Sequence, residues 1–259
     1  MYYNSALHEF RCYRDSNWEP CGINPIDRGF AITDEFLGGQ GTTDGAIGDN
    51  GWTRQPIGVL GNSYEEYNTG INPTADHPGI YRINPNGGTT PTINTGITLT
   101  LGNFSNPGSM ALAASDVVKT TVAVGSSTSN TQIMRVGLHN QTTGTARPTT
   151  GVWWEADPTN NANWEYCYTN ATPAAVCAAS GTAIAANTFV RLGIQITALG
   201  TGTSAVTFTI NGTASSVSAV TVNTTNLAAP AISCYAPPAS VQHCYVDYYQ
   251  IFGLSSAAR

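Results

Sequence analysis

The feature that most constrains this chain is a long succession of short segments in which apolar and polar residues alternate. Successive side chains of a β-strand point to opposite faces of a sheet, so a period of two predicts strands with one buried face. Gly, Pro and Asn separate these segments at intervals of about 8 to 15 residues, a spacing typical of β-sandwiches and barrels. No segment keeps a period of 3.6 residues for long, so we expect little helix.

Eleven strands are predicted in the main part of the chain. They are residues 79–83, 97–101, 117–124, 132–138, 151–157, 163–169, 189–197, 205–212, 220–223, 230–236 and 243–254. The clearest local prediction is a hairpin in AVTFTINGTASSVSAV, because Val206, Phe208 and Ile210 share one face and Asn211-Gly212 is typical of a two-residue turn.

Residues 1–29 differ from the rest in their high density of charged side chains and in carrying the first two cysteines. The alternation in LHEFRCYRD predicts a strand, and Asp15-Ser16-Asn17 is typical of a turn. We therefore predict a small disulfide-closed hairpin or connector over residues 1–29 and one large all-β domain over residues 30–259.

The six cysteines fall into three couples nine or ten residues apart. These couples are Cys12 with Cys21, Cys167 with Cys177, and Cys234 with Cys244. Six cysteines allow 15 pairings, but this local spacing favours disulfides that close hairpins, and the short C-x₂₋₄-C step of zinc sites does not occur. Disulfides indicate an oxidising environment. The N-terminus lacks the basic start and apolar stretch of a signal peptide. Two explanations for disulfides then stay open: the chain is a fragment of a longer protein, or it belongs to a particle that is oxidised after release from the cell.

The composition argues against two classes of partner. Lys119 is the single lysine and the net charge is −6, whereas nucleic-acid binding needs clustered Lys and Arg. No apolar run approaches the roughly 20 residues of a membrane span. We therefore expect neither nucleic-acid binding nor membrane insertion.

From Phe30 onward, short motifs follow one another in a characteristic order: DEFLGG, DNGW, HPGIYRI, IMRVGLHN, GVWWEADP with NWEYCYT, TFTINGT and VDYYQIFGL. This order resembles the concanavalin A-like, or laminin G-like, jelly roll of lectins, glucanases and phage tail-fibre and virion proteins. The order of these motifs spans about nine-tenths of the chain. The resemblance implies a two-sheet jelly-roll sandwich.

The pattern YYN…FRCY…W…C in the first 29 residues resembles a motif found beside fibre modules. With the jelly-roll resemblance, it implies a non-enzymatic module on a virion surface or extracellular fibre. Its expected role is either adhesion to a cell-surface glycan or a structural role in the particle or fibre. Its expected partners are other virion or fibre subunits, including copies of itself as in a trimer. A bacterial surface adhesin of the same fold is an alternative.

A glycan-degrading hydrolase is the enzymatic alternative. Glucanases of this fold carry E-x-D-x-x-E on one strand, and Glu155 and Asp157 match its first two positions. The third position is Asn160, which cannot act as a general acid. Pro158 should also end the strand and leave Asp157 to open an Asx-turn. Glu165, across a hairpin, is the remaining candidate for a second carboxylate.

Sugar binding would use aromatic side chains that stack on a pyranose, together with polar side chains of a rim loop. Such residues gather around DPTNNAN: Trp153, Asp157, Asn163, Trp164 and Tyr166. Neighbouring side chains of a strand face opposite ways, so only one of Trp153 and Trp154 belongs in the core. Core or subunit packing is the competing interpretation for most of these aromatics.

A structural calcium is the cofactor that the resemblance implies, held between the first and last strands of the jelly roll. Asp34 and Asp247 match the positions that supply its oxygens. The alternative is that each aspartate accepts hydrogen bonds from a neighbouring strand.

Overall fold

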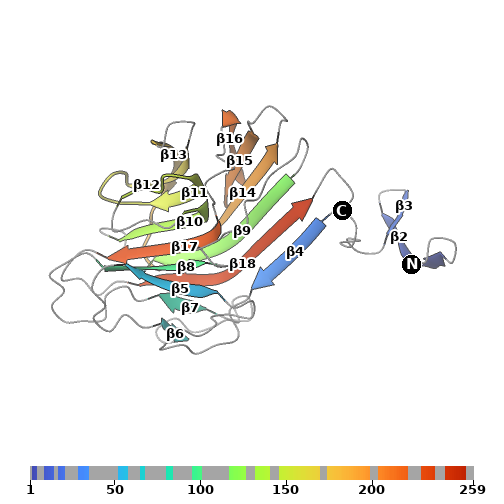
Figure 1. The fold of residues 1–259 in the computed structure, drawn as a ribbon, viewed down its shortest axis with the longest axis horizontal. Helices are drawn as coiled ribbons and strands as arrows, with labels where there is room; N and C mark the ends of the chain where they lie inside the picture. The colour runs from blue at the N-terminus through green and yellow to red at the C-terminus, as the bar shows by residue number, and fades with distance from the viewer. Residues whose placement is uncertain are drawn as a thin grey trace.

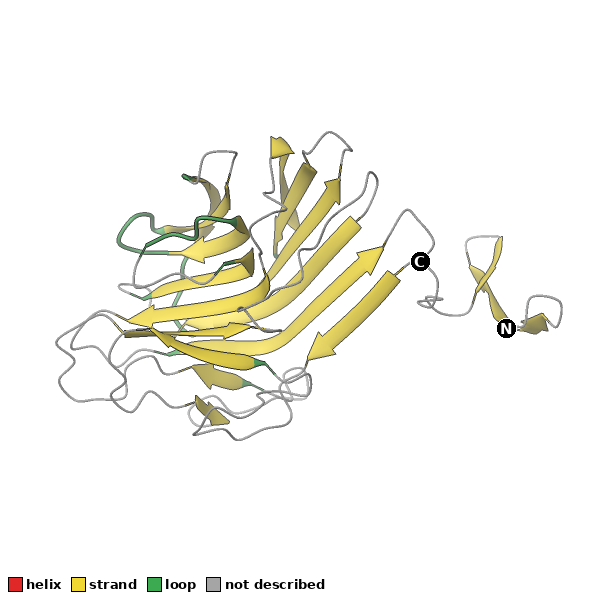
Figure 2. Cartoon of the chain, in the orientation of Figure 1, coloured by secondary structure: helices red, strands yellow, loops and turns green. Residues whose placement is uncertain are grey.

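The fold comes from a computed structural model of the chain. It describes residues 2–4, 9–14, 17–20, 29–34, 52–57, 65–67, 80–83, 95–100, 117–126, 132–140, 146–169, 174–198, 204–220, 229–236 and 243–254. These residues form strands, turns and connecting loops without a helix (Figure 2). They accordingly include no helix that is long and apolar enough to cross a membrane.

Two antiparallel sheets make up the main domain, and the first has seven strands in the order β13-β12-β11-β10-β17-β8-β5. Its strands are β5 (Thr53–Ile57), β8 (Thr95–Thr100), β10 (Ile133–His139), β11 (Gly151–Ala156), β12 (Asn163–Thr169), β13 (Ala175–Ala183) and β17 (Ala229–Ala236). Strands β10 and β11 are buried on both faces.

The second sheet has eight strands, seven of them in the order β16-β15-β14-β9-β18-β7-β6, with β4 also paired to β18. Its strands are β4 (Gly29–Asp34), β6 (Glu65–Tyr67), β7 (Tyr81–Ile83), β9 (Val117–Ser126), β14 (Val190–Ala198), β15 (Ser204–Ile210), β16 (Thr213–Val220) and β18 (Cys244–Leu254). Strands β9, β18 and β4 lie side by side (Figure 1). The first and last strands of the sandwich are therefore neighbours.

The core lies between the two sheets and is built from alternate residues of their strands. Trp154 of β11 donates a hydrogen bond from Nε1 to the Gly193 carbonyl of β14 at 3.0 Å. Its ring also meets the ring of Phe208 in β15 edge-on, with centroids 5.7 Å apart. Burying one large apolar side chain of this kind contributes about 2 kcal/mol. The chain is thus an all-β, two-sheet jelly-roll sandwich, as the sequence predicted.

Two disulfides confirm the predicted cysteine couples within the sandwich. Cys167–Cys177 joins directly paired positions of β12 and β13. Cys234–Cys244 joins β17 to β18 and therefore links the two sheets. The hairpin interpretation is right for the first bridge and wrong for the second, because β17 and β18 belong to different sheets. Cys21 lies outside the described residues, so its bond to Cys12 stays a prediction.

The predicted hairpin at Asn211-Gly212 is confirmed. Both residues have positive φ, 49° and 87°, as a type I′ turn requires, and β15 pairs with β16 on either side. Strand β16 begins at Thr213 and ends at Val220, so most of it precedes the predicted strand 220–223. The other residues of that predicted strand lie outside the described part of the chain.

A separate three-stranded sheet precedes the sandwich. It consists of β1 (Tyr2–Asn4), β2 (Glu9–Arg14) and β3 (Asn17–Pro20). Strands β2 and β3 pair antiparallel with Arg14 opposite Asn17, as the predicted hairpin requires. The division into domains at residue 29 stays a prediction.

Candidate functional site

A row of polar side chains crosses the seven-stranded sheet at directly paired positions of five neighbouring strands. Its members, here called the polar row, are Thr98, Ser233, Arg135, Glu155 and Glu165. Directly paired residues project from the same face of a sheet, and this face is opposite to the one that forms the core. All five residues are buried, so each of them needs a polar partner.

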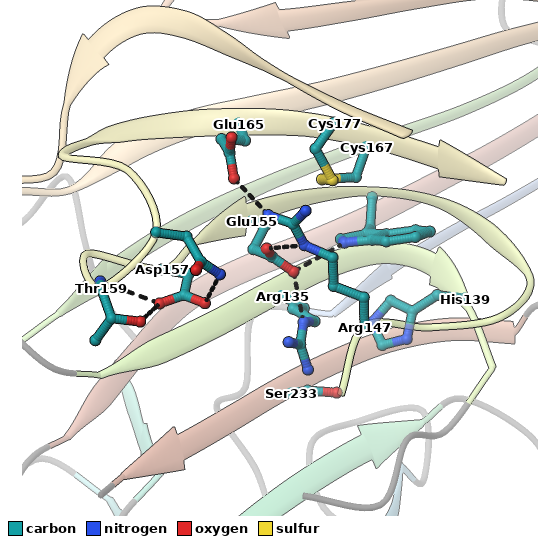
Figure 3. Close-up of polar contacts among 12 residues, drawn as sticks. Arg135, His139, Arg147, Glu155, Asp157, Thr159, Glu165, Cys167, Cys177 and Ser233 are labelled. Carbon is teal, nitrogen blue, oxygen red and sulfur yellow. Dashed lines mark hydrogen bonds and ion pairs between the residues drawn. A yellow bond between two sulfur atoms is a disulfide. The ribbon is translucent and has the colours of Figure 1, made fainter. Parts of the chain in front are cut away.

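Ion pairs supply these partners in the second half of the row (Figure 3). The Glu155 carboxylate accepts a hydrogen bond from Arg135 Nε on one oxygen and from Arg147 Nε on the other, each at 2.7 Å. Arg147 Nη2 also donates to Glu165 Oε2 at 2.7 Å. One guanidinium group thus bridges two carboxylates of adjacent strands.

Arg147 reaches this position from the segment that connects β10 to β11. Asn140 fixes the end of that segment: its Oδ1 accepts hydrogen bonds from the backbone N–H groups of Thr149 and Thr150 at 3.1 and 3.0 Å. The Arg147 side chain is 31% exposed, whereas the Arg135 and Glu155 side chains are 0% exposed. Arg147 therefore lies where the buried ion pairs meet solvent.

The electrostatic surroundings hold Arg147 in its charged form. Burial by itself would lower the pKa of Arg147, but the charge and hydrogen bond of Glu155, followed by the charges of Glu165 and Asp157, raise it above its ordinary value. The guanidinium therefore stays protonated.

His139 is a second buried group on this face. Its Nδ1–H donates to the Asn140 carbonyl at 2.9 Å, and its ring lies edge-on to Trp153 with centroids 6.3 Å apart. Burial lowers the pKa of His139 to about 4 and outweighs the hydrogen bond to Asn140, while the charge of Arg135 lowers it further. The imidazole is therefore neutral at physiological pH.

Asp157 caps the turn that follows β11. Its Oδ1 accepts hydrogen bonds from Thr159 N and Oγ1 at 3.1 and 2.6 Å, and its Oδ2 accepts one from Asn160 Nδ2 at 2.6 Å. This confirms the Asx-turn predicted at Asp157. Asn160 accordingly lies in this turn rather than on the strand.

The predicted aromatic sugar platform is not assembled on one surface. Trp164 and Tyr166 lie on the core side of β12, where Tyr166 packs against Phe208 at 5.3 Å between ring centroids. Trp153 lies on the opposite face but is 0% exposed. Stacking on a pyranose needs an accessible ring face, which neither Trp153 nor Trp164 offers.

Asn163, in contrast, lies at the edge of the ion-pair cluster. Asn161 Oδ1 accepts hydrogen bonds from Asn163 N and Nδ2, and Asn161 Nδ2 donates to Glu165 Oε1 at 3.3 Å. The half-buried Arg147, Asn161 and Asn163 and the carboxylate of Glu165 thus form one partly accessible polar surface, here called the Arg147 surface.

The arrangement does not favour the hydrolase alternative. A nucleophile or general acid must reach the substrate, but Glu155 is 0% exposed and both of its oxygens accept hydrogen bonds from arginines. Glu165 is bridged to it by Arg147 rather than facing it across an open space. Asp157 is bound within its own turn.

One metal-like grouping occurs among the described residues. Ligand atoms of Glu155, Cys167 and Cys177 lie within 4.8 Å of one another. The two sulfur atoms are joined in a disulfide, whereas metal ligation requires free thiolates. The grouping reflects the packing of the disulfide beside Glu155.

The two aspartates predicted to hold calcium lie on neighbouring strands. Asp34 pairs with Tyr249 at the end of β4, and Asp247 lies two residues before Tyr249 in β18. Both are buried, and Asp34 Oδ2 accepts a hydrogen bond from Trp52 Nε1 at 3.0 Å. Calcium takes six to eight oxygen ligands, and among the described residues no third carboxylate joins these two. The calcium site stays a prediction.

Comparisons with solved structures support the fold. A protein of unknown function from Shewanella oneidensis MR-1 is 17% identical, with 90% of this chain and 89% of that chain covered and a TM-score of 0.58. The binding domain of botulinum neurotoxin DC, solved in complex with rat synaptotagmin II, is 8% identical. That match covers 89% of this chain and 49% of the other, with a TM-score of 0.51.

A third match is arcelin-5, a lectin-like defense protein from Phaseolus vulgaris, at 7% identity and a TM-score of 0.49, with 88% and 99% of the two chains covered. The chain spans about half the length of the toxin domain that it matches. No protein-family model and no curated protein sequence matches the chain. Identities this low concern the fold alone.

Proposed function

We propose that the chain is a non-enzymatic, lectin-like module that binds glycans through the Arg147 surface. The jelly-roll fold hosts many functions, so the site rather than the fold must indicate what this chain does. The observation that carries the proposal is the ion-paired state of Glu155, whose two oxygens are held by Arg135 and Arg147 at 2.7 Å. A carboxylate held in this way serves to orient Arg147 rather than to transfer a proton.

We further propose that the module is displayed on a virion surface or an extracellular fibre. Two disulfides in the sandwich support an oxidising environment, and the N-terminal sequence motif supports a place beside fibre modules. Its partners there are other virion or fibre subunits, including further copies of itself. A trimer is the oligomer to seek by light scattering coupled to size-exclusion chromatography.

A glycan array with a parallel hydrolysis assay tests the proposed activity. We expect the purified chain to bind a subset of glycans and to release no reducing ends from any of them. Glu155→Gln should weaken binding because Arg147 loses one of the two carboxylates that position it. Release of reducing ends that Glu155→Gln abolishes would instead establish the hydrolase.

A further inference from the structure

The Arg147 surface offers hydrogen-bond donors and acceptors side by side. Arginine carries five N–H donors, and Arg147 uses Nε and one Nη2 hydrogen in its ion pairs with Glu155 and Glu165. Glu165 Oε1 accepts from the Asn161 amide at 3.3 Å, and each carboxylate oxygen can accept a further bond. A ligand at this surface therefore meets a planar donor group next to a planar acceptor group.

The charges around Arg147 are already compensated within the protein. Two guanidinium groups, of Arg135 and Arg147, face the carboxylates of Glu155 and Glu165 at 2.7 Å. Asp157 is close enough to raise the pKa of Arg147, and burial keeps His139 neutral. The cluster as a whole therefore carries no excess positive charge.

This balance disfavours an anionic ligand. A carboxylate or sulfate bound to Arg147 would lie beside Glu155 and Glu165, which contact the same guanidinium group. Charges at contact distance interact strongly in a partly buried site, so repulsion from two carboxylates offsets the attraction to one arginine. An uncharged ligand avoids this cost.

Sugar hydroxyl groups fit the remaining chemistry, because each hydroxyl both donates and accepts hydrogen bonds. We propose that the Arg147 surface binds uncharged saccharides that present two adjacent hydroxyl groups, one accepting from Arg147 and the other donating to Glu165. This inference rests on the proposed glycan-binding function and names its ligand class. It excludes sialylated, uronate-containing and sulfated glycans as preferred ligands.

The test is an array of neutral glucose-, galactose-, mannose- and fucose-terminated oligosaccharides together with sialylated and sulfated counterparts. Titration calorimetry on the best probe then measures Kd from 50 to 500 mM NaCl. We expect neutral probes to bind, with Kd changing by less than about twofold, because screening acts on charged ligands. Binding confined to acidic probes, with Kd rising as salt rises, overturns the inference and leaves glycan binding intact. Silence on both sets overturns the glycan-binding proposal itself.

Two variants of Arg147 and one matched control locate the site. Arg147→Lys keeps the charge but loses the planar fork, and we expect it to weaken binding about tenfold, as does Arg147→Ala. Arg191→Lys alters an exposed arginine on β14 of the other sheet and should leave Kd unchanged. Thermal unfolding reports whether each variant is folded. Unchanged binding in a folded Arg147→Lys variant places the ligand elsewhere and overturns the inference.

Discussion

At the scale of single residues, the buried ion pairs make Glu155 the most sensitive position on the outer face of the seven-stranded sheet. Glu155→Gln keeps the shape but removes the carboxylate that pairs with the buried Arg135 at 2.7 Å. Removing one partner of a buried pair costs about 3 to 5 kcal/mol, and we expect that loss in the free energy of unfolding measured with urea.

Glu165→Gln is the matched control for this prediction. The Glu165 side chain is 11% exposed and its Arg147 partner is 31% exposed, so solvent can replace part of the interaction and we expect about 1 kcal/mol. Equal losses in the two variants would show that Glu155 has no special role.

The buried His139 should make the stability of the fold depend on pH. The histidine has a pKa of 6.5 in its ordinary state and about 4 in the fold, so between these values the unfolded chain binds more protons and stability falls as pH drops. The shift corresponds to a loss on the order of 3 kcal/mol. Urea unfolding at pH 7 and pH 4 should show a smaller decrease for His139→Gln than for the parent chain. Equal decreases would show that His139 is not the group responsible.

The candidate site was only partly predictable at this scale. The alternation along GVWWEADP predicted that only one of Trp153 and Trp154 belongs in the core, and Pro158 predicted a turn at Asp157. Arg135, Arg147 and His139 were not predicted as site residues. Their position depends on the register between β10 and β11 and on a connecting segment whose course carries no periodic signal in the sequence.

At the scale of elements, two glycines with positive φ differ in the space around them. Their alanine variants therefore distinguish the cost of backbone strain from the cost of steric overlap. Gly212 has a φ of 87° and open space around the position that a Cβ would take, whereas a Cβ on Gly137 would lie 2.5 Å from the Val152 carbonyl oxygen. Gly212→Ala should therefore cost about 1 to 2 kcal/mol from its left-handed backbone alone. Gly137→Ala should cost more, about 3 kcal/mol or above, because overpacking adds to the backbone strain.

Thermal and urea unfolding of the two glycine variants checks this order. A reversed order would mean that β10 can move away from β11 without loss. The contact between the sheets makes that movement costly, since Tyr249 of β18 donates a hydrogen bond to the Gly137 carbonyl at 3.0 Å.

Strands with clear alternation were predicted well, and strands without it were missed. Strand β12 has the bounds predicted for it, 163–169, because aromatic residues alternate along it. Strand β13 has the sequence AVCAASGTA, and its small residues carry neither high β-propensity nor a period of two. Strand β13 is instead held in the sheet by its pairing with β12 and by the Cys167–Cys177 bridge.

At the scale of the whole molecule, comparing the two disulfides of the sandwich distinguishes two contributions to stability. One is the restriction of the unfolded chain, and the other is packing in the native state. Each disulfide closes a loop with a sequence separation of 10, so restriction of the unfolded chain should contribute nearly the same free energy, about 3 kcal/mol, to both. The native surroundings differ. Cys234 and Cys244 are both 0% exposed and link the two sheets, whereas Cys177 lies half-buried on the edge strand β13.

Replacing both cysteines of each bridge by alanine should therefore give unequal losses. The Cys234→Ala/Cys244→Ala variant loses the common entropic contribution and also leaves a cavity between the sheets, which adds about 1 to 2 kcal/mol. Hydrogen exchange should rise in β17 and β18 and in their neighbours in both sheets. In Cys167→Ala/Cys177→Ala, the rise should be confined to β12 and β13, because an edge strand opens at low free energy without the rest of the sandwich. Equal losses and equally widespread exchange would mean that the inter-sheet bridge adds nothing to the packing of the two sheets.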